Sequence, residues 1–202
     1  MYAWACFDRA VRLAELVEAV DVPVDEWRKE REDVREDVLA NGYDRELSSF
    51  VQSYGARNVD GSLLRIPLLG FLDGDDPRVL GTLERLEAEL GEAGDLLHRY
   101  DPEVTGDGID SAEGAFLLCS FEMAAALVLA GRVDEARRRF QSLCDRAGPL
   151  GLYSEEMTAE GIMLGNYPQA FTHLALIQAA ANVNDAGRRD ALHEWADRRR
   201  RT

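Results

Sequence analysis

Hydrophobic residues recur at intervals of three or four along most of the chain, as they do in helices. Near the start, Trp4, Phe7 and Val11 share one face, and charged residues lie largely opposite. The segments with this pattern are 2–20, 25–40, 62–72, 76–90, 112–130, 133–147 and 169–183. Residues 43–57 alternate weakly, which predicts a loop with a short extended piece. The pattern therefore predicts an all-α fold.

Two kinds of helical segment alternate along the chain. The segments that are apolar nearly throughout, and so predicted to be buried on more than one side, are 62–72, 112–130 and 169–183. The segments with a charged face are 25–40, 76–90 and 133–147. This order predicts inner and outer layers of helices in a toroid. A solenoid of helix pairs would also alternate, but the chain shows no repeat near the roughly 34 residues of a tetratricopeptide array.

Long connections occur only where a charged helix is followed by an apolar one. They are residues 41–61, 91–111 and 148–168. In a two-layered toroid, connections of the same type lie at the same end. We therefore expect the three long connections to share one rim, and long loops on a rigid scaffold commonly carry function.

The net charge of the chain argues against a nucleic-acid partner. There are 38 Asp and Glu residues against 23 Lys and Arg, a net charge of −15, and Lys29 is the only lysine. An acidic surface repels phosphate backbones, so we expect no nucleic-acid partner. The acidic, arginine-rich composition is typical of a salt-adapted (halophilic) source or of a high-GC genome. No apolar run reaches the roughly 18 residues of a membrane span, and no secretory signal is recognisable.

The three cysteines, Cys6, Cys119 and Cys144, are too scattered for a disulfide framework. Cys6 and Cys119 lie in apolar surroundings, which predicts buried free thiols. No histidine has metal-ligand spacing with them, so we expect no metal site and no cofactor. These features indicate a reducing, cytoplasmic location.

The residue types on the expected rim are those of a sugar-binding site, in which aromatic faces stack on rings and planar polar groups bind hydroxyls. These residues are Gln52, Tyr54, Asn58, Asp60, His98, Arg99, Tyr100, Asp101, Asp110, Glu113, Glu155 and Glu156. Glycoside hydrolysis needs two carboxyl groups, one to protonate the leaving oxygen and one to activate water or attack. The pattern alone leaves open that Glu155 and Glu156 are a solvated surface pair with no role in catalysis, because adjacent glutamates on a loop are commonly only solvated.

Several long strings of this chain closely resemble glycoside hydrolase family 15, which includes glucoamylases, glucodextranases and microbial trehalases. The strings are WACFDRAVRLAE (4–15), FVQSYG (50–55), GSLLRIPLLGFLDGDDPRV (61–79), AEGAFLLCSFEMAAALVLAGRVDEAR (112–137), GLYSEE (151–156) and LGNYPQAFTHLALIQAA (164–180). The resemblance implies a partial (α/α)6 barrel with about seven of twelve helices. Residues 1–184 would form the C-terminal part of this catalytic domain, and 185–202 would be a charged tail, helical or frayed.

The resemblance also implies roles for particular residues in inverting cleavage of α-linked glucosides, such as glucan ends or trehalose. Glu155 matches the general base, and Glu156 falls where the family often has a sugar-contacting polar residue. Arg99 and Tyr100 are similar to a pair that binds the sugar at the cleavage point, and Glu113 matches an acidic position near that pocket. The roles of Asp60, Tyr54 and Asp110 are left open.

Two departures from the family pattern qualify these expectations. After Glu156 the family commonly continues Tyr-Asp-Pro, whereas this chain has Met157-Thr158-Ala159. The family's general acid lies in a tryptophan-glutamate motif before the helix that begins WACFDRA, and the chain carries no such motif there. We therefore expect a truncated domain whose acid comes from a separately encoded N-terminal half. The alternatives are an inactive remnant and a non-catalytic helical interaction module.

Overall fold

The computed structural model describes residues 1–18, 21–93, 95–101, 104 and 113–186. Its α-helices are α1 (Tyr2–Leu16), α2 (Val24–Asn41), α3 (Arg65–Leu68), α4 (Pro77–Leu90), α5 (Leu117–Leu129), α6 (Val133–Cys144) and α7 (Ala170–Asp185), and a 3-10 turn η1 (Gly61–Leu64) precedes α3. Each lies within or close to a segment that the periodicity marks as helical. The described part of the chain contains no helix long and apolar enough to cross a membrane.

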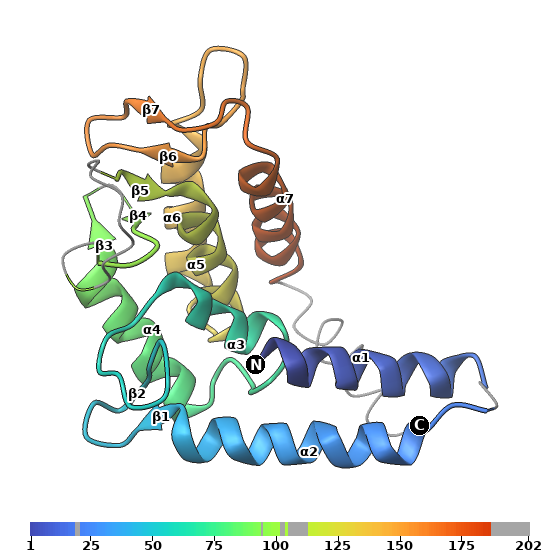
Figure 1. The fold of residues 1–202 in the computed structure, drawn as a ribbon. Helices are drawn as coiled ribbons and strands as arrows, with labels where there is room; N and C mark the ends of the chain where they lie inside the picture. The colour runs from blue at the N-terminus through green and yellow to red at the C-terminus, as the bar shows by residue number, and fades with distance from the viewer. Residues whose placement is uncertain (19–20, 94, 102–103, 105–112, 187–202) are drawn as a thin grey trace.

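The helices form the two layers that their patterns predict. Helix α5 is inner, and all its residues except Leu118 and Leu129 are buried. The charged helices α4 and α6 bury one face each and are outer, while α7 packs against α5 and α6. Helices α1 and α2 pack on each other and extend from the body as an arm (Figure 1). The result is an L-shaped arrangement, with the arm on one side and α5–α7 on the other.

The prediction that 169–183 is buried all round is wrong. Only Thr172, Ala175, Ala179 and Asn182 of α7 are buried, and large apolar side chains on its open face reach solvent. No described element packs on that face. The apolar pattern of α7 therefore matches a burial that the described part of the chain does not provide.

Short β-ladders lie within the long connections and, for β5, just after the second one, and the sequence predicted only the extended piece of the first. They are β1 (Tyr43–Asp44) with β2 (Ser49–Phe50), β3 (Gly91–Glu92) with β4 (Leu96–Leu97), and a sheet of β5 (Ala115–Phe116), β6 (Glu156–Met157) and β7 (Met163–Leu164). Strand β5 displaces the expected helix start, so α5 begins at Leu117 rather than near residue 112. Residues 115 and 116 pair with β6 instead of continuing a helix.

Backbone contacts confirm that the three long connections meet at one rim. Asp60 and Tyr100 form an antiparallel bridge between the first and second connections, and the N–H of Gly61 donates to the carbonyl of Arg99 at 2.7 Å. Phe116 pairs with Glu156, which joins the third connection to the start of α5. The Tyr100 hydroxyl donates to Glu113, and the N–H of the next residue, Gly114, donates to Glu156, so side chains link these two sets of contacts at one rim.

The core follows both sides of α5. Met123 and Leu127 pack with Phe71 and Leu83 on one side, while Phe121 on the other meets Tyr153 edge-on at 5.4 Å. All three cysteines are free thiols. Cys119 is buried as expected, but Cys6 is exposed, because it lies on the side of α1 that faces away from the buried Trp4 and Ala5 cluster.

Candidate active site

Glu155 is held from both directions at the end of the third long connection. Its carbonyl accepts from the N–H of Leu117 at 3.0 Å, and its own N–H donates to the carbonyl of Asn166 at 3.0 Å. The carboxylate atom Oε2 accepts from both the backbone N–H of Asn166 (3.2 Å) and its side-chain amide (2.9 Å). One oxygen of this carboxylate is thus fixed by two donors, and no donor from the described residues anchors Oε1.

Gly165 allows this close turn. Its φ of +72° lies in the left-handed region, and a Cβ placed on it would lie 2.9 Å from Oε2 and 3.0 Å from Cβ of Glu155. Any side chain would therefore push on the carboxylate as well as strain the backbone.

Glu156 occupies the middle strand of the three-stranded sheet, opposite Phe116 on one side and Leu164 on the other. Its Oε2 accepts from the N–H of Gly114 at 3.0 Å. Partial burial raises the pKa of Glu156, and the nearby carboxylates of Glu113 and Glu155 add to the rise, against the opposing effects of the Gly114 hydrogen bond and of Arg99.

Arg99, Tyr100 and Glu113 form one polar group beside these glutamates. The Tyr100 hydroxyl accepts from Nη2 of Arg99 at 2.9 Å and donates to Oε1 of Glu113 at 3.0 Å. Arg99 also pairs with Glu113 at 3.2 Å, and its guanidinium lies 4.6 Å from the ring centre of Tyr100 and 5.5 Å from that of Phe116. The arginine is therefore oriented by stacking on two rings as well as by charge.

The guanidinium remains charged in this setting. Partial burial lowers the pKa of Arg99, but the Tyr100 hydroxyl and the carboxylates of Glu113 and Glu156 outweigh burial and raise it overall. The site thus combines a fixed cation, three carboxyl groups and aromatic faces. Such a set can bind sugar hydroxyls and activate a water molecule.

The structure brings together the five residues singled out as catalytic or substrate-binding. Of the first connection, Asp60 meets this group through its backbone bridge to Tyr100, whereas the side chain of Tyr54 is turned to α2. Tyr54 donates to Asp37 of α2 at 2.7 Å, and burial and the aspartate raise its pKa to about 12. Asn58 donates to Gln52, and Asp60 caps η1 by accepting from the N–H of Ser62 at 3.0 Å. Tyr54, whose role the sequence left open, points to Asp37 of the outer helix α2. Asp110 lies outside the described residues.

Two contributors were missed from the sequence. Asn166 and Phe116 lie within quoted family strings, but no spacing rule marks an amide eleven residues from the glutamate that it orients. Among the described residues, no group of three or more His, Cys, Asp or Glu side chains is placed to hold a metal ion.

Comparison with known proteins assigns the chain to a protein family. The model of glycosyl hydrolases family 15 matches residues 1–181, and the chain belongs to that family. It is 40% identical over 185 residues to a trehalase of Thermoplasma volcanium, and 42% identical over 181 residues to a trehalase of Mycobacterium tuberculosis. These matches cover 91% and 89% of this chain but only 29% and 26% of the relatives.

Solved structures show the same fold. A bacterial glucoamylase complexed with acarbose superposes with a TM-score of 0.73 at 17% identity, covering 90% of this chain and 32% of that one. A wild-type glycosidase superposes with a TM-score of 0.67 at 20% identity, covering 81% of this chain and 46% of that one. The likeness confirms a partial (α/α)6 barrel, and the chain spans less than half of each of these proteins.

Proposed function

We propose that this chain supplies the general-base half of an inverting glycoside hydrolase that acts on α-linked glucosides. Glu155 removes a proton from the attacking water through Oε1, because Oε2 already accepts two hydrogen bonds from Asn166. This one-sided fixing of a carboxylate at the rim is the observation that carries the proposal. A base held in one orientation presents a single acceptor to the water that it activates.

The other four residues hold the substrate. Arg99, kept charged and stacked on two rings, donates to sugar hydroxyls, while Tyr100 and Glu113 fix its orientation. Glu156, tied to the N–H of Gly114, borders the same space and accepts from a hydroxyl. Trehalose is the first substrate to test, because the relatives with the higher identities are trehalases; glucan ends are the next.

The general acid would come from the part of the domain that this chain does not cover. Loss of a general acid typically lowers the rate by a factor on the order of 10²–10⁴. We infer that the partner is a separately encoded N-terminal half of the barrel. Free thiols, one of them exposed, support a reducing compartment such as the cytoplasm for this complex.

The test is trehalose hydrolysis by this chain co-expressed with that half. Glu155→Gln should lower kcat by a factor on the order of 10²–10⁴. Glu160→Gln is the matched control, because Glu160 is an exposed carboxylate on the same connection, and it should leave kcat unchanged. Full activity of the Glu155→Gln complex would refute the assignment of the base.

The second candidate function is a non-catalytic interaction module, which the open apolar face of α7 favours. The same assay separates the two. A complex that forms but hydrolyses neither trehalose nor maltose supports the module or an inactive remnant.

A further inference from the structure

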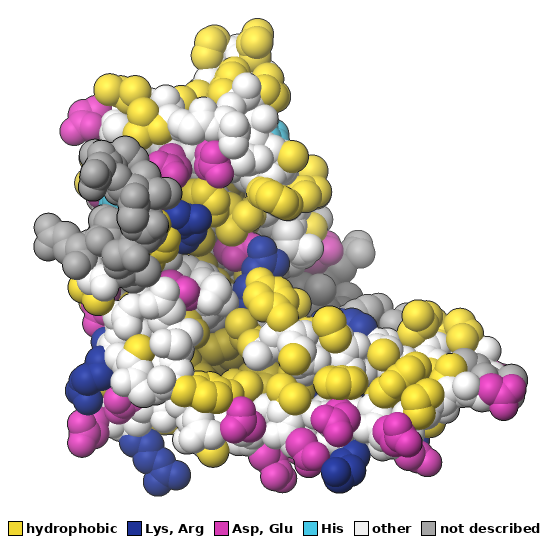
Figure 2. All heavy atoms as spheres, viewed as in Figure 1, with side chains coloured by type: hydrophobic (Ala, Val, Ile, Leu, Met, Phe, Trp, Pro, Cys, Tyr) yellow, Lys and Arg dark blue, Asp and Glu magenta, His cyan; other side chains and the backbone are white. Residues whose placement is uncertain are grey.

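A concave cleft of about 1390 Å³ lies where the α1–α2 arm meets the body, away from the rim. Its walls come from α1, α2, the segment 65–74, α5 and α7. Figure 2 shows this side of the molecule, with hydrophobic side chains along the arm and the body and basic side chains near the corner between them. None of the five rim residues lines the cleft.

Helices α7 and α1, on the two sides of this cleft, each expose large apolar side chains. Phe171, Leu174 and Ile177 of α7 are 62%, 61% and 62% exposed, and the first two line the cleft. Leu13 and Leu16 of α1 are 60% and 66% exposed. Leu13, Leu16 and Ile177 lie on the same two helices but outside the lining of the cleft. Exposed apolar side chains at helical spacing are typical of a surface that another polypeptide covers.

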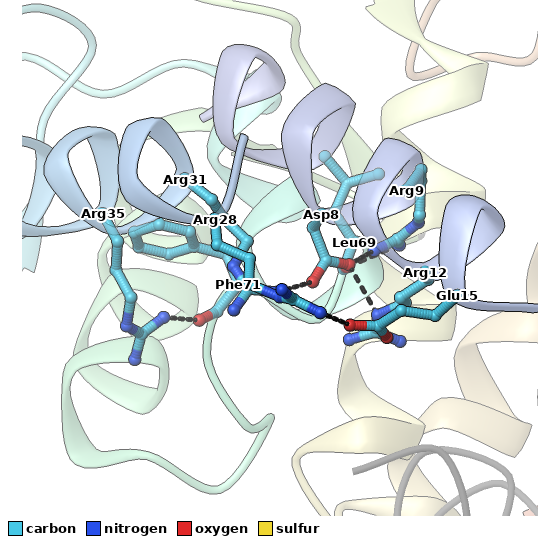
Figure 3. Close-up of polar contacts among 9 residues, drawn as sticks. All are labelled: Asp8, Arg9, Arg12, Glu15, Arg28, Arg31, Arg35, Leu69 and Phe71. Atoms are coloured by element: carbon cyan, nitrogen blue, oxygen red, sulfur yellow. Dashed lines mark hydrogen bonds and ion pairs between the residues drawn. The ribbon is translucent and has the colours of Figure 1, made fainter. Parts of the chain in front are cut away.

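Where the α1–α2 arm meets the body, three guanidinium groups surround one buried carboxylate (Figure 3). The carboxylate of Asp8 is only 3% exposed, and it pairs with Arg9, with Arg12 at 3.0 Å and with Arg31 at 3.4 Å. Three guanidinium groups thus share one carboxylate, although the chain as a whole carries a charge of −15. Arg9 also donates to the carbonyl of Leu69 at 2.7 Å.

Other arginines of the cleft have partners of their own. Arg78 pairs with Asp76 at 2.7 Å, Arg65 pairs with Glu122, and Arg35 donates to the carbonyl of Phe71 at 2.5 Å. Within the described part of the chain, Glu32 lines the same wall but makes no ion pair with the cluster. The described residues that line the cleft include six arginines and six Asp or Glu residues, so the cleft as a whole is balanced, and the local surplus of guanidinium groups is the cluster at Asp8.

We propose that this cleft is the docking site for the remaining part of the family 15 domain, and that the incoming polypeptide places a carboxylate on Arg12 and Arg31. Each guanidinium offers five N–H donors, and the contacts with Asp8 use one nitrogen of each. Both side chains are about a third exposed, at 31% and 29%, so their other donors can be reached. An Arg–carboxylate contact adds direction to apolar packing and selects the register of the partner.

The occupant is argued from coverage and charge. The superposed glycosidase and glucoamylase leave more than half of their own lengths unmatched, so the family barrel contains further elements beside these helices. A second copy of this chain would bring another such arginine cluster and a like net charge to a symmetric contact. The inference rests on the proposed function only in taking the partner to be the half that carries the acid.

The experiment uses the full chain co-expressed with a tagged Thermoplasma volcanium trehalase from which the matching segment has been deleted. The wild-type chain should co-purify with this probe, and rising salt should weaken the complex. Arg12→Glu combined with Arg31→Glu should weaken association about tenfold or more. The matched control is Arg137→Glu with Arg138→Glu, since both arginines are exposed on outer helix α6 and the charge change is the same.

Association that is absent with the wild-type chain, or weakened equally by the control pair, would overturn the proposal. So would a stable dimer of the isolated chain in light scattering, since a second copy would then occupy the face. Arg12→Gln alone serves if the double variant does not fold, and binding equal to wild type would count against the proposal. Glu155→Gln should bind normally while its kcat falls by a factor on the order of 10²–10⁴, so failure of docking and failure of the proposed catalysis are distinguishable.

Discussion

Asn166 donates two hydrogen bonds to one oxygen of Glu155, from its backbone N–H at 3.2 Å and from its side-chain amide at 2.9 Å. Asn166→Ala removes the shorter of the two and leaves the backbone donor. In the complemented enzyme, kcat should fall roughly tenfold while KM changes little, because a misaligned base affects the reaction and not sugar binding. An increase in KM at unchanged kcat would place Asn166 in substrate binding instead.

Gly165 offers a test of the same turn by steric means. Gly165→Ala should reduce activity and stability together, because the new Cβ would lie about 3 Å from Glu155. Gly151→Ala is the control, since its φ of +71° nearly equals that of Gly165 but nothing lies within 4 Å of its Cβ position. Both variants should lose about 1–2 kcal/mol for the left-handed backbone. Only Gly165→Ala should also lose activity; equal activities would show that the contact is unimportant.

The Tyr100 hydroxyl bridges Arg99 and Glu113, so its removal should loosen the arginine. Tyr100→Phe should raise KM for trehalose about tenfold, which corresponds to one lost hydrogen bond of roughly 1.4 kcal/mol. Tyr54→Phe also removes a hydroxyl that is bonded to a single partner, Asp37, but on the outer layer. Its KM should be that of the wild type. Steady-state kinetics of the complemented enzyme decide between these outcomes.

Glu122 on α5 predicts a pH dependence of stability. Burial raises the pKa of Glu122 from 4.5 to about 7, even though the ion pair with Arg65 lowers it. The folded state therefore holds a proton that the unfolded state releases at lower pH, and the free energy of unfolding should fall as pH rises from about 4.5 to 7.

Over that window this one group contributes a loss on the order of 3 kcal/mol. Urea titrations of the chain at several pH values should show the slope. Glu122→Gln should flatten it, whereas Glu84→Gln, at an exposed position, should not. A slope unchanged by Glu122→Gln would mean that the carboxylate titrates as it does in the unfolded chain.

The helices and their layers were predictable because each follows from a local pattern. Helix α5 is apolar along nearly its whole length and is buried except at Leu118 and Leu129, while α4 and α6 are amphipathic and lie outside it. The short strands were not predictable in the same way. Alternation cannot be recognised over the two residues of β5, whose partner β6 lies some forty positions later in the chain.

The candidate site was predictable only where its residues fall in family strings. Glu155 and Arg99 stood out through resemblance, and the structure adds the contacts that make them a group. The role of Tyr54 could not be predicted, because its place on a rim connection says nothing about the direction of its side chain, which donates to Asp37. The open face of α7 escaped prediction because periodicity reports that a face is to be covered, but not by which chain.

The open edge of this toroid differs from the open edge of a sheet. The backbone N–H and C=O groups of α7 are paired within the helix, so the face that it presents offers side chains and no row of unpaired main-chain groups. A strand in that position would be a template for indiscriminate ladder pairing. A helical barrel can therefore be divided between two polypeptides and rejoined by side-chain recognition alone, which makes the joint open to tuning by point mutation.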